Sequence, residues 1–266
     1  MATSTRNDRR REARTRLHAE QEEPARRARP RGRLSAGGAV VALLGVAAAG
    51  AVYATATDSA APEADKPFVQ PAHTTGKDGI TVPYGKADAR NVLSVWLDPR
   101  CPYCAGVETG LGKTFREEAD AGTFRVEYHF ATFLDGALGG KGSKRALNAL
   151  GAAVNESPEK FVEYLGVLYA NHPEKESDDE FGSTATLLEL ADQVPGLRTP
   201  AFNKAVKELT YMPWVEKVGQ AFYDQGKKGT PDVSLDGKEL TLNSGEGIES
   251  ITPDAFRKLV TENRKA

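Results

Sequence analysis

The sequence predicts an α/β fold in which a βαβ unit and a ββα unit are separated by an all-helical insertion, with a transmembrane helix before them. Two cysteines, Cys101 and Cys104, lie between the apolar strand-like run 92–97 and a proline-free helical stretch that reaches residue 121. Helical patterns fill residues 138–226, and a hairpin signal and a last helix close the chain. These three observations together favour one mixed α/β domain.

Three segments precede the expected domain at 79–266. Residues 1–33 contain eleven arginines, five acidic residues and almost no large apolar side chains, so we expect a disordered basic segment. Residues 34–56 carry no charge and are long enough to span a membrane, which takes about 20 apolar residues, so we expect a signal-anchor helix. Residues 57–78 are rich in Ala, Pro, Thr and Asp, which is typical of a linker.

The charge pattern predicts the orientation of the chain. Because the arginines precede the apolar segment, the N-terminus is expected in the cytoplasm and the domain outside, in a single-pass protein of a bacterial cell membrane. A cleaved signal peptide remains the alternative, since residues 54–56 (Ala-Thr-Ala) resemble a cleavage site. The net charge of −2 divides into +6 for residues 1–33 and −8 for the rest, which excludes a nucleic-acid binder.

The elements of the domain follow from residue patterns. Two apolar runs at 80–84 and 91–98 predict strands, the stretch 105–121 before Gly122 predicts a helix, and 123–130 predicts a parallel strand. Periodic apolar residues predict the helices of the insertion at 141–154, 159–170, 184–193, 200–209 and 213–225. An Asp-Gly turn at 236–237 joins strands at 232–235 and 239–242, and Thr252 caps a helix at 253–263.

The cysteine pair predicts thiol chemistry. Cys101 and Cys104 share one face of the first turn of a helix, where free N–H groups and the helix dipole favour a thiolate. A purely structural bridge across two residues closes too small a loop to stabilise much. Zinc needs two more ligands, and none of the four histidines is paired at ligand spacing (His18, His73, His129 and His172), so we expect no metal. In an exported domain such a pair is expected to be oxidised or to cycle.

The order of three motifs resembles a known family. Cys101-Pro102-Tyr103-Cys104 follows the central strand, the helical insertion comes next, and Gly229-Thr230-Pro231 precedes the late hairpin. Over residues 80–264 this order resembles the DsbA-like thiol-disulfide oxidoreductases, which have a thioredoxin-like fold with a helical insertion. The resemblance implies a cis proline at Pro231, opposite the cysteine pair. It also implies that the backbone of Thr230 pairs with an extended client chain.

The resemblance also implies roles for the residues around the pair. Cys101 is the attacking sulfur, and Cys104 resolves the mixed disulfide. Four neighbours are expected to tune the redox chemistry: Pro102, Tyr103, Arg100 and Asp98.

Two of these neighbours have specific expected effects. Arg100 adjoins the attacking sulfur and is expected to add positive potential there. Many relatives have a buried acid six residues before the first cysteine, where this chain has Val95. Asp98 is therefore expected to be the nearest carboxylate that can carry a proton.

The implied function is disulfide formation in exported proteins that contain cysteine thiols. No cofactor is expected, and a quinone-linked membrane partner would reoxidise the pair. Because direction depends on redox poise, an extracytoplasmic reductase or isomerase remains open. A redox-quiet peptide-binding module of the same fold is the alternative from another class.

Overall fold

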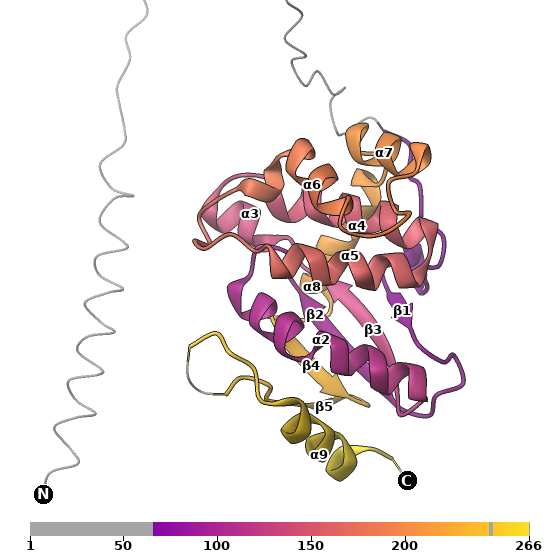
Figure 1. Cartoon of the computed structure of the whole chain (residues 1–266), viewed down its shortest axis with the longest axis vertical. Helices are drawn as coiled ribbons and strands as arrows, with labels where there is room; N and C mark the ends of the chain where they lie inside the picture. Colours follow the sequence, from indigo (N-terminus) through magenta and orange to yellow (C-terminus); the bar gives the residue numbers. More distant parts are fainter. Residues whose placement is uncertain (1–65, 245–246, 266) are drawn as a thin grey trace, which may run out of the picture. The chain divides into compact units, whose positions relative to one another are not determined.

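Figure 1 shows the computed structural model of the chain, which describes residues 66–244 and 247–265. The basic segment 1–33, the anchor 34–56 and most of the linker 57–78 lie outside these residues. Within the described ranges, no helix combines the length and the apolar character that a membrane crossing requires.

A five-stranded mixed sheet forms the centre of the domain, with the strand order β1-β3-β2-β4-β5. Strands β2 and β3 run parallel, and every other pair in this sheet is antiparallel. The parallel pair and the helix between them form the predicted βαβ unit. The strands are β1 (Val82–Tyr84), β2 (Val92–Leu97), β3 (Arg125–Phe130), β4 (Asp232–Leu235) and β5 (Lys238–Glu239).

Helices cover the sheet and build the insertion (Figure 1). Side chains of Ser157, Ser183, Thr199 and Thr252 accept hydrogen bonds at the helix starts that they cap, which explains why those helices begin where they do. The helices are α2 (Pro102–Ala121), α3 (Phe133–Leu138), α4 (Gly142–Glu156), α5 (Pro158–Ala170), α6 (Thr184–Ala191), α7 (Pro200–Lys207), α8 (Met212–Asp224) and α9 (Pro253–Asn263), with short 3₁₀ turns η3 (Lys77–Gly79) and η4 (Glu180–Gly182).

The predicted thioredoxin-like order of elements, with its helical insertion, is confirmed. The ends of other elements differ from the sequence prediction by up to three residues, and two larger differences stand out. Helix α3 was not expected, because six residues are too few to show a helical period. Strand β5 is Lys238–Glu239 rather than 239–242, although the N–H of Leu240 still donates to the carbonyl of Val233 and Leu240 and Leu242 are buried in the core.

The two faces of the sheet pack against different helices. Tyr128 and Phe130 of β3 pack their rings against Phe161 of α5. On the opposite face, Trp96 of β2 contacts His129 of β3 and Phe222 of α8. Because side chains alternate along each strand, β2 and β3 are buried on both sides and hold the start of α2 in a fixed place.

The long segment before α9 crosses the cysteine helix at two glycines. A Cβ atom at Gly106 would collide with the backbone carbonyl of Ile248, and one at Gly110 would collide with the hydroxyl of Ser250. These glycines therefore allow the segment to lie directly on the backbone of α2.

Candidate functional site

The cysteine pair lies where β2 ends and α2 begins. Cys101 is the N-cap residue of α2, Pro102 occupies the first turn, and the backbone N–H of Cys101 donates to the carbonyl of Asp98 over 2.9 Å. A proline suits the first turn because its missing N–H has no partner to lose there. The sequence thus turns sharply out of the strand and presents Cys101 at the free N–H groups of a 20-residue helix.

The two sulfurs differ in accessibility and in pKa. Cys101 is 5% exposed and Cys104 is fully buried at 0%, which confirms the predicted order of accessibility. A hydrogen bond from Cys104 lowers the pKa of Cys101 to about 7, against the effect of burial, with further help from Thr230 and from first-turn N–H groups. Burial raises the pKa of the Cys104 thiol well above its ordinary value. Because of this asymmetry, Cys101 rather than Cys104 is the sulfur that ionises near neutral pH.

The loop before β4 closes the site from the other side. The Thr230–Pro231 peptide bond is cis, as predicted. The Cys101 thiol lies 3.4 Å from the Thr230 carbonyl oxygen, to which it can donate. The hydroxyl of Thr230 is also buried, and it has no hydrogen-bond partner among the described residues. It can therefore donate a hydrogen bond to a thiolate at Cys101.

A groove of about 360 Å³ opens beside this loop. It is lined by Tyr103, Thr230, Pro231 and the segment 239–243, among other residues. Tyr103, which lies between the two cysteines in the sequence, lines the groove and is 47% exposed. The predicted substrate-binding residues therefore share a concave surface with Tyr103, which is an arrangement that suits an extended chain.

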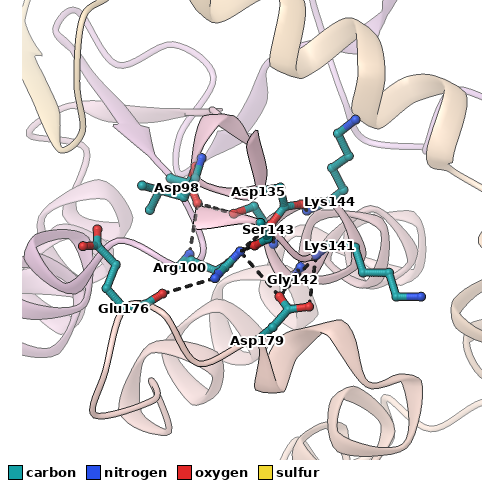
Figure 2. A network of polar contacts seen from close by, with 11 residues as sticks. Asp98, Arg100, Asp135, Lys141, Gly142, Ser143, Lys144, Glu176 and Asp179 are labelled. Atoms are coloured by element: carbon teal, nitrogen blue, oxygen red, sulfur yellow. Dashed lines mark hydrogen bonds and ion pairs between the residues drawn. The ribbon is translucent and has the colours of Figure 1, made fainter. Parts of the chain in front are cut away.

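Arg100 lies next to Cys101 in the sequence, but its charge is engaged by the helical insertion (Figure 2). The guanidinium contacts Asp135 at 3.1 Å and Asp179 at 3.5 Å, and it donates to the carbonyls of Gly139 and Glu176. Two carboxylates thus balance its charge. The structure gives Arg100 a role in anchoring the insertion that the sequence did not predict, and its redox tuning stays a prediction.

The same two carboxylates cap the N-terminus of α4. Asp135 accepts hydrogen bonds from the backbone N–H groups of Ser143 and Lys144, and Asp179 accepts from those of Lys141 and Gly142. Figure 2 shows both carboxylates between Arg100 and this helix start. Because a helix N-terminus has unpaired donors and positive potential, the two acids stabilise both the cation and the helix.

Asp98 is fully buried one turn before the cysteines. Its carboxylate accepts hydrogen bonds from the Ser143 hydroxyl at 2.6 Å and from the backbone N–H groups of Arg100 and Leu134. Burial raises the pKa of Asp98 to about 6, and these donors oppose the shift. Val95, at the position where relatives have an acid, is buried in the core. Proton transfer by Asp98 stays a prediction.

Two buried residues near the pair were not predicted to belong to the site. Tyr169 of α5 donates its phenolic hydroxyl to the carbonyl of Asp98 over 3.0 Å. Glu108, one turn beyond Cys104 on α2, pairs with Arg116 at 2.8 Å while its second oxygen has no partner among the described residues. Burial raises the pKa of Glu108 to about 7. Apolar periodicity alone indicated a core position for Tyr169, and its polar contact depends on the fold.

The described residues contain no group of three or more His, Cys, Asp or Glu side chains that could hold a metal ion. His129 stacks on Trp96 with ring centres 4.6 Å apart, and burial lowers its pKa to about 4. This histidine is therefore a neutral packing residue at neutral pH.

Comparisons with known proteins agree with this architecture. A family model described as "Thioredoxin" matches residues 77–262. DsbA from Mycobacterium tuberculosis is 24% identical, with a TM-score of 0.56 over 69% of this chain and 91% of that one. MdbA, a thiol-disulfide oxidoreductase from Actinomyces oris, is 20% identical, with a TM-score of 0.58 over 79% and 96% of the two chains. BdbD from Bacillus subtilis is 18% identical, with a TM-score of 0.56 over 74% and 97%. No curated protein matches the sequence.

Proposed function

Because this chain belongs to the thioredoxin family and has the DsbA-like form of its fold, we propose that it is a protein thiol-disulfide oxidoreductase that forms disulfides in exported proteins. One observation carries the proposal. The pKa of Cys101 falls to about 7 at a helix N-terminus, whereas Cys104 is buried beneath it as a neutral thiol. A structural or merely packed pair gains nothing from that asymmetry, but an exchange reaction needs it.

The proposed reaction is thiol-disulfide exchange with the oxidised pair. A client thiolate attacks the sulfur of Cys101, the Cys101–Cys104 bond breaks, and its electron pair leaves on Cys104. A second client thiolate then attacks the client sulfur of the mixed disulfide and releases Cys101 as a thiolate. The client is oxidised by two electrons and the cysteine pair is reduced by two. The pair needs no cofactor for either step.

The surroundings of the pair support the client that we propose. The groove beside Pro231 is open, and it is lined by Thr230, whose carbonyl contacts the Cys101 sulfur. An extended client segment that carries a thiol can therefore bind there. The carbonyl and N–H of Thr230 lie on an irregular segment just before β4, where they can pair with such a segment.

The location is part of the proposal. The uncharged segment 34–56 would anchor the chain in the membrane, with the basic residues 1–33 inside and the thiol domain outside. A quinone-linked membrane partner would reoxidise the pair after each turnover. An accessibility assay with single cysteines placed in residues 1–33 and at the exposed Lys258 of the full-length chain tests this orientation. Labelling of residues 1–33 from outside intact cells would contradict it.

Mixed-disulfide trapping tests the chemistry. Cys104→Ser should accumulate mixed disulfides with exported proteins, because the resolving sulfur is missing, whereas Cys101→Ser should form none. The reduction potential of the full-length protein then separates the directions. A potential above that of the client thiols supports the oxidase, and a potential as low as that of thioredoxin would favour the reductase. Trapping by the Cys101→Ser variant alone, or no alkylation of Cys101 at neutral pH, would contradict the proposed exchange.

A further inference from the structure

Tyr169 is tied to the cysteine loop although it lies about seventy residues later in the chain. Its ring is buried where α5 packs on α2, and its hydroxyl donates to the carbonyl of Asp98 over 3.0 Å. The same carbonyl accepts the N–H of Cys101 over 2.9 Å. One carbonyl oxygen therefore joins the tyrosine to the turn that presents the attacking sulfur.

The backbone of Asp98 also serves the second sulfur. Burial raises the pKa of the Cys104 thiol well above its ordinary value, and a backbone hydrogen bond from Asp98 opposes that effect. The Asp98 N–H is the donor of that bond, while the Asp98 carbonyl, in the next peptide group, accepts from Tyr169 and Cys101. The Asp98 carboxylate is held separately by Ser143, Arg100 and Leu134.

The phenol itself remains neutral beside the two sulfurs. Burial raises the pKa of Tyr169 well above its ordinary value, and the charges of Cys104, Cys101, Asp98 and Glu108 raise it further. At any pH that the fold tolerates, Tyr169 therefore acts as a hydrogen-bond donor and not as an ion.

We propose that Tyr169 is a positioning residue for the Cys104 thiolate: its hydroxyl fixes the Asp98 backbone, whose N–H stabilises the charge that appears on Cys104 during exchange. This inference rests on the proposed function, because it concerns a step of the same reaction. Without the hydroxyl, the Asp98 carbonyl keeps only the N–H of Cys101 as a partner. The donor to Cys104 is then held less firmly at the moment when the negative charge forms.

Two reactions of the cysteine pair differ in whether Cys104 acquires a negative charge. When a thiolate attacks the oxidised protein at Cys101, the bonding electron pair leaves on Cys104, so the rate depends on how well a Cys104 thiolate is stabilised. When iodoacetamide alkylates the reduced protein, a new S–C bond forms at Cys101 and iodide leaves, and Cys104 acquires no charge. Tyr169 should therefore affect the first reaction and not the second.

The same helix offers a matched control. Tyr164 is also fully buried on α5, and its hydroxyl donates to the backbone carbonyl of Leu187 over 2.7 Å, on the side of α6. Tyr164→Phe and Tyr169→Phe each remove one buried hydroxyl and leave one carbonyl without that donor. Their effects on thermal unfolding should be similar, so a difference in kinetics cannot come from stability alone.

The experiment measures reduction of the oxidised full-length protein by dithiothreitol and alkylation of the reduced protein by iodoacetamide, in wild type and both variants. We expect Tyr169→Phe to slow reduction roughly fivefold, the equivalent of one ordinary hydrogen bond, with alkylation unchanged and Tyr164→Phe like the wild type. Equal reduction rates in all three proteins would overturn the proposal. So would a parallel loss of both reactions in Tyr169→Phe, because that pattern indicates a distorted site.

Dithiothreitol reduces any accessible disulfide, whether or not the protein oxidises clients. The ratio of the reduction rates therefore tests Tyr169 independently of the proposed function. Oxidation of a reduced dicysteine peptide by the wild type, measured in parallel, tests the function itself. A wild type that fails to oxidise the peptide but still shows the difference between the tyrosine variants would contradict the function and leave the role of Tyr169 supported.

Discussion

Replacing Arg100 by methionine should lower the free energy of unfolding more than the replacement of an exposed charged residue does. The guanidinium is 2% exposed, and it lies between Asp135, which is 6% exposed, and the more accessible Asp179. Methionine keeps much of the apolar stem but leaves the buried Asp135 carboxylate without its cation. Breaking a buried ion pair in this way costs about 3–5 kcal/mol.

The structure places the expected cost near the lower end of that range. Asp135 and Asp179 each keep two backbone N–H donors at the start of α4 after the arginine is removed, so neither carboxylate is left without partners. We therefore expect the free energy of unfolding to fall by about 3 kcal/mol. Adding Asp135→Asn should recover part of the loss, since the double variant no longer buries an unpaired charge.

Arg257 provides the control. It also contacts acidic side chains, Glu117, Glu118 and Asp254, but its side chain is 40% exposed. Arg257→Met should cost much less than Arg100→Met, because water screens such exposed pairs. Urea unfolding of the reduced full-length proteins, followed by circular dichroism, measures both losses. A cost of Arg100→Met no larger than that of Arg257→Met would refute the reasoning.

Three further predictions address the cysteine helix. Tyr103→His should raise the reduction potential, because histidine can stabilise the Cys101 thiolate, and each 30 mV corresponds to roughly 1.4 kcal/mol; an unchanged or lower potential by glutathione titration contradicts this. Burial raises the pKa of Glu108 from 4.5 to about 7, so its protonated form favours the fold: that stability is present below pH 4.5 and is lost as the pH rises through 7. Relative to Glu108→Gln, the wild type should therefore lose about 3 kcal/mol of unfolding free energy between pH 4 and pH 8, and parallel pH curves in urea titrations would contradict the shift. Gly106→Ala places a methyl group on the backbone of Ile248 and should cost about 1–3 kcal/mol, measured as a shift of the urea midpoint; an unchanged midpoint would show that the segment moves freely.

Much of the fold was predictable because its signals are local. The cap at Thr252 and the apolar periods of the insertion depend on residues within a few positions of each other. The start of α2 was equally local, since the cysteines follow an apolar strand and Pro102 suits a first turn. These signals gave the βαβ unit and the insertion without any knowledge of tertiary contacts.

The surroundings of the site were not predictable in the same way. Arg100 was expected to act on the neighbouring sulfur, but its partners Asp135 and Asp179 arrive from distant parts of the chain. Tyr169 resembled any apolar residue of a buried helix stripe, and nothing near it in sequence indicated a partner at Asp98. Polar contacts between separate segments depend on how the helices and strands pack. Local sequence patterns do not show which distant segments come into contact.

The double capping of α4 has a consequence for how this fold can vary in evolution. Arg100 joins the cysteine loop to the insertion through acids that come from α3 and from the segment before η4. A lineage can lengthen or shorten α6 and α7 without touching that junction. Residues between β3 and the start of α4 cannot change length without moving Asp135 away from Arg100. We therefore expect insertions and deletions among relatives to gather at the far end of the helical region, while the spacing from Cys101 to Gly142 is preserved.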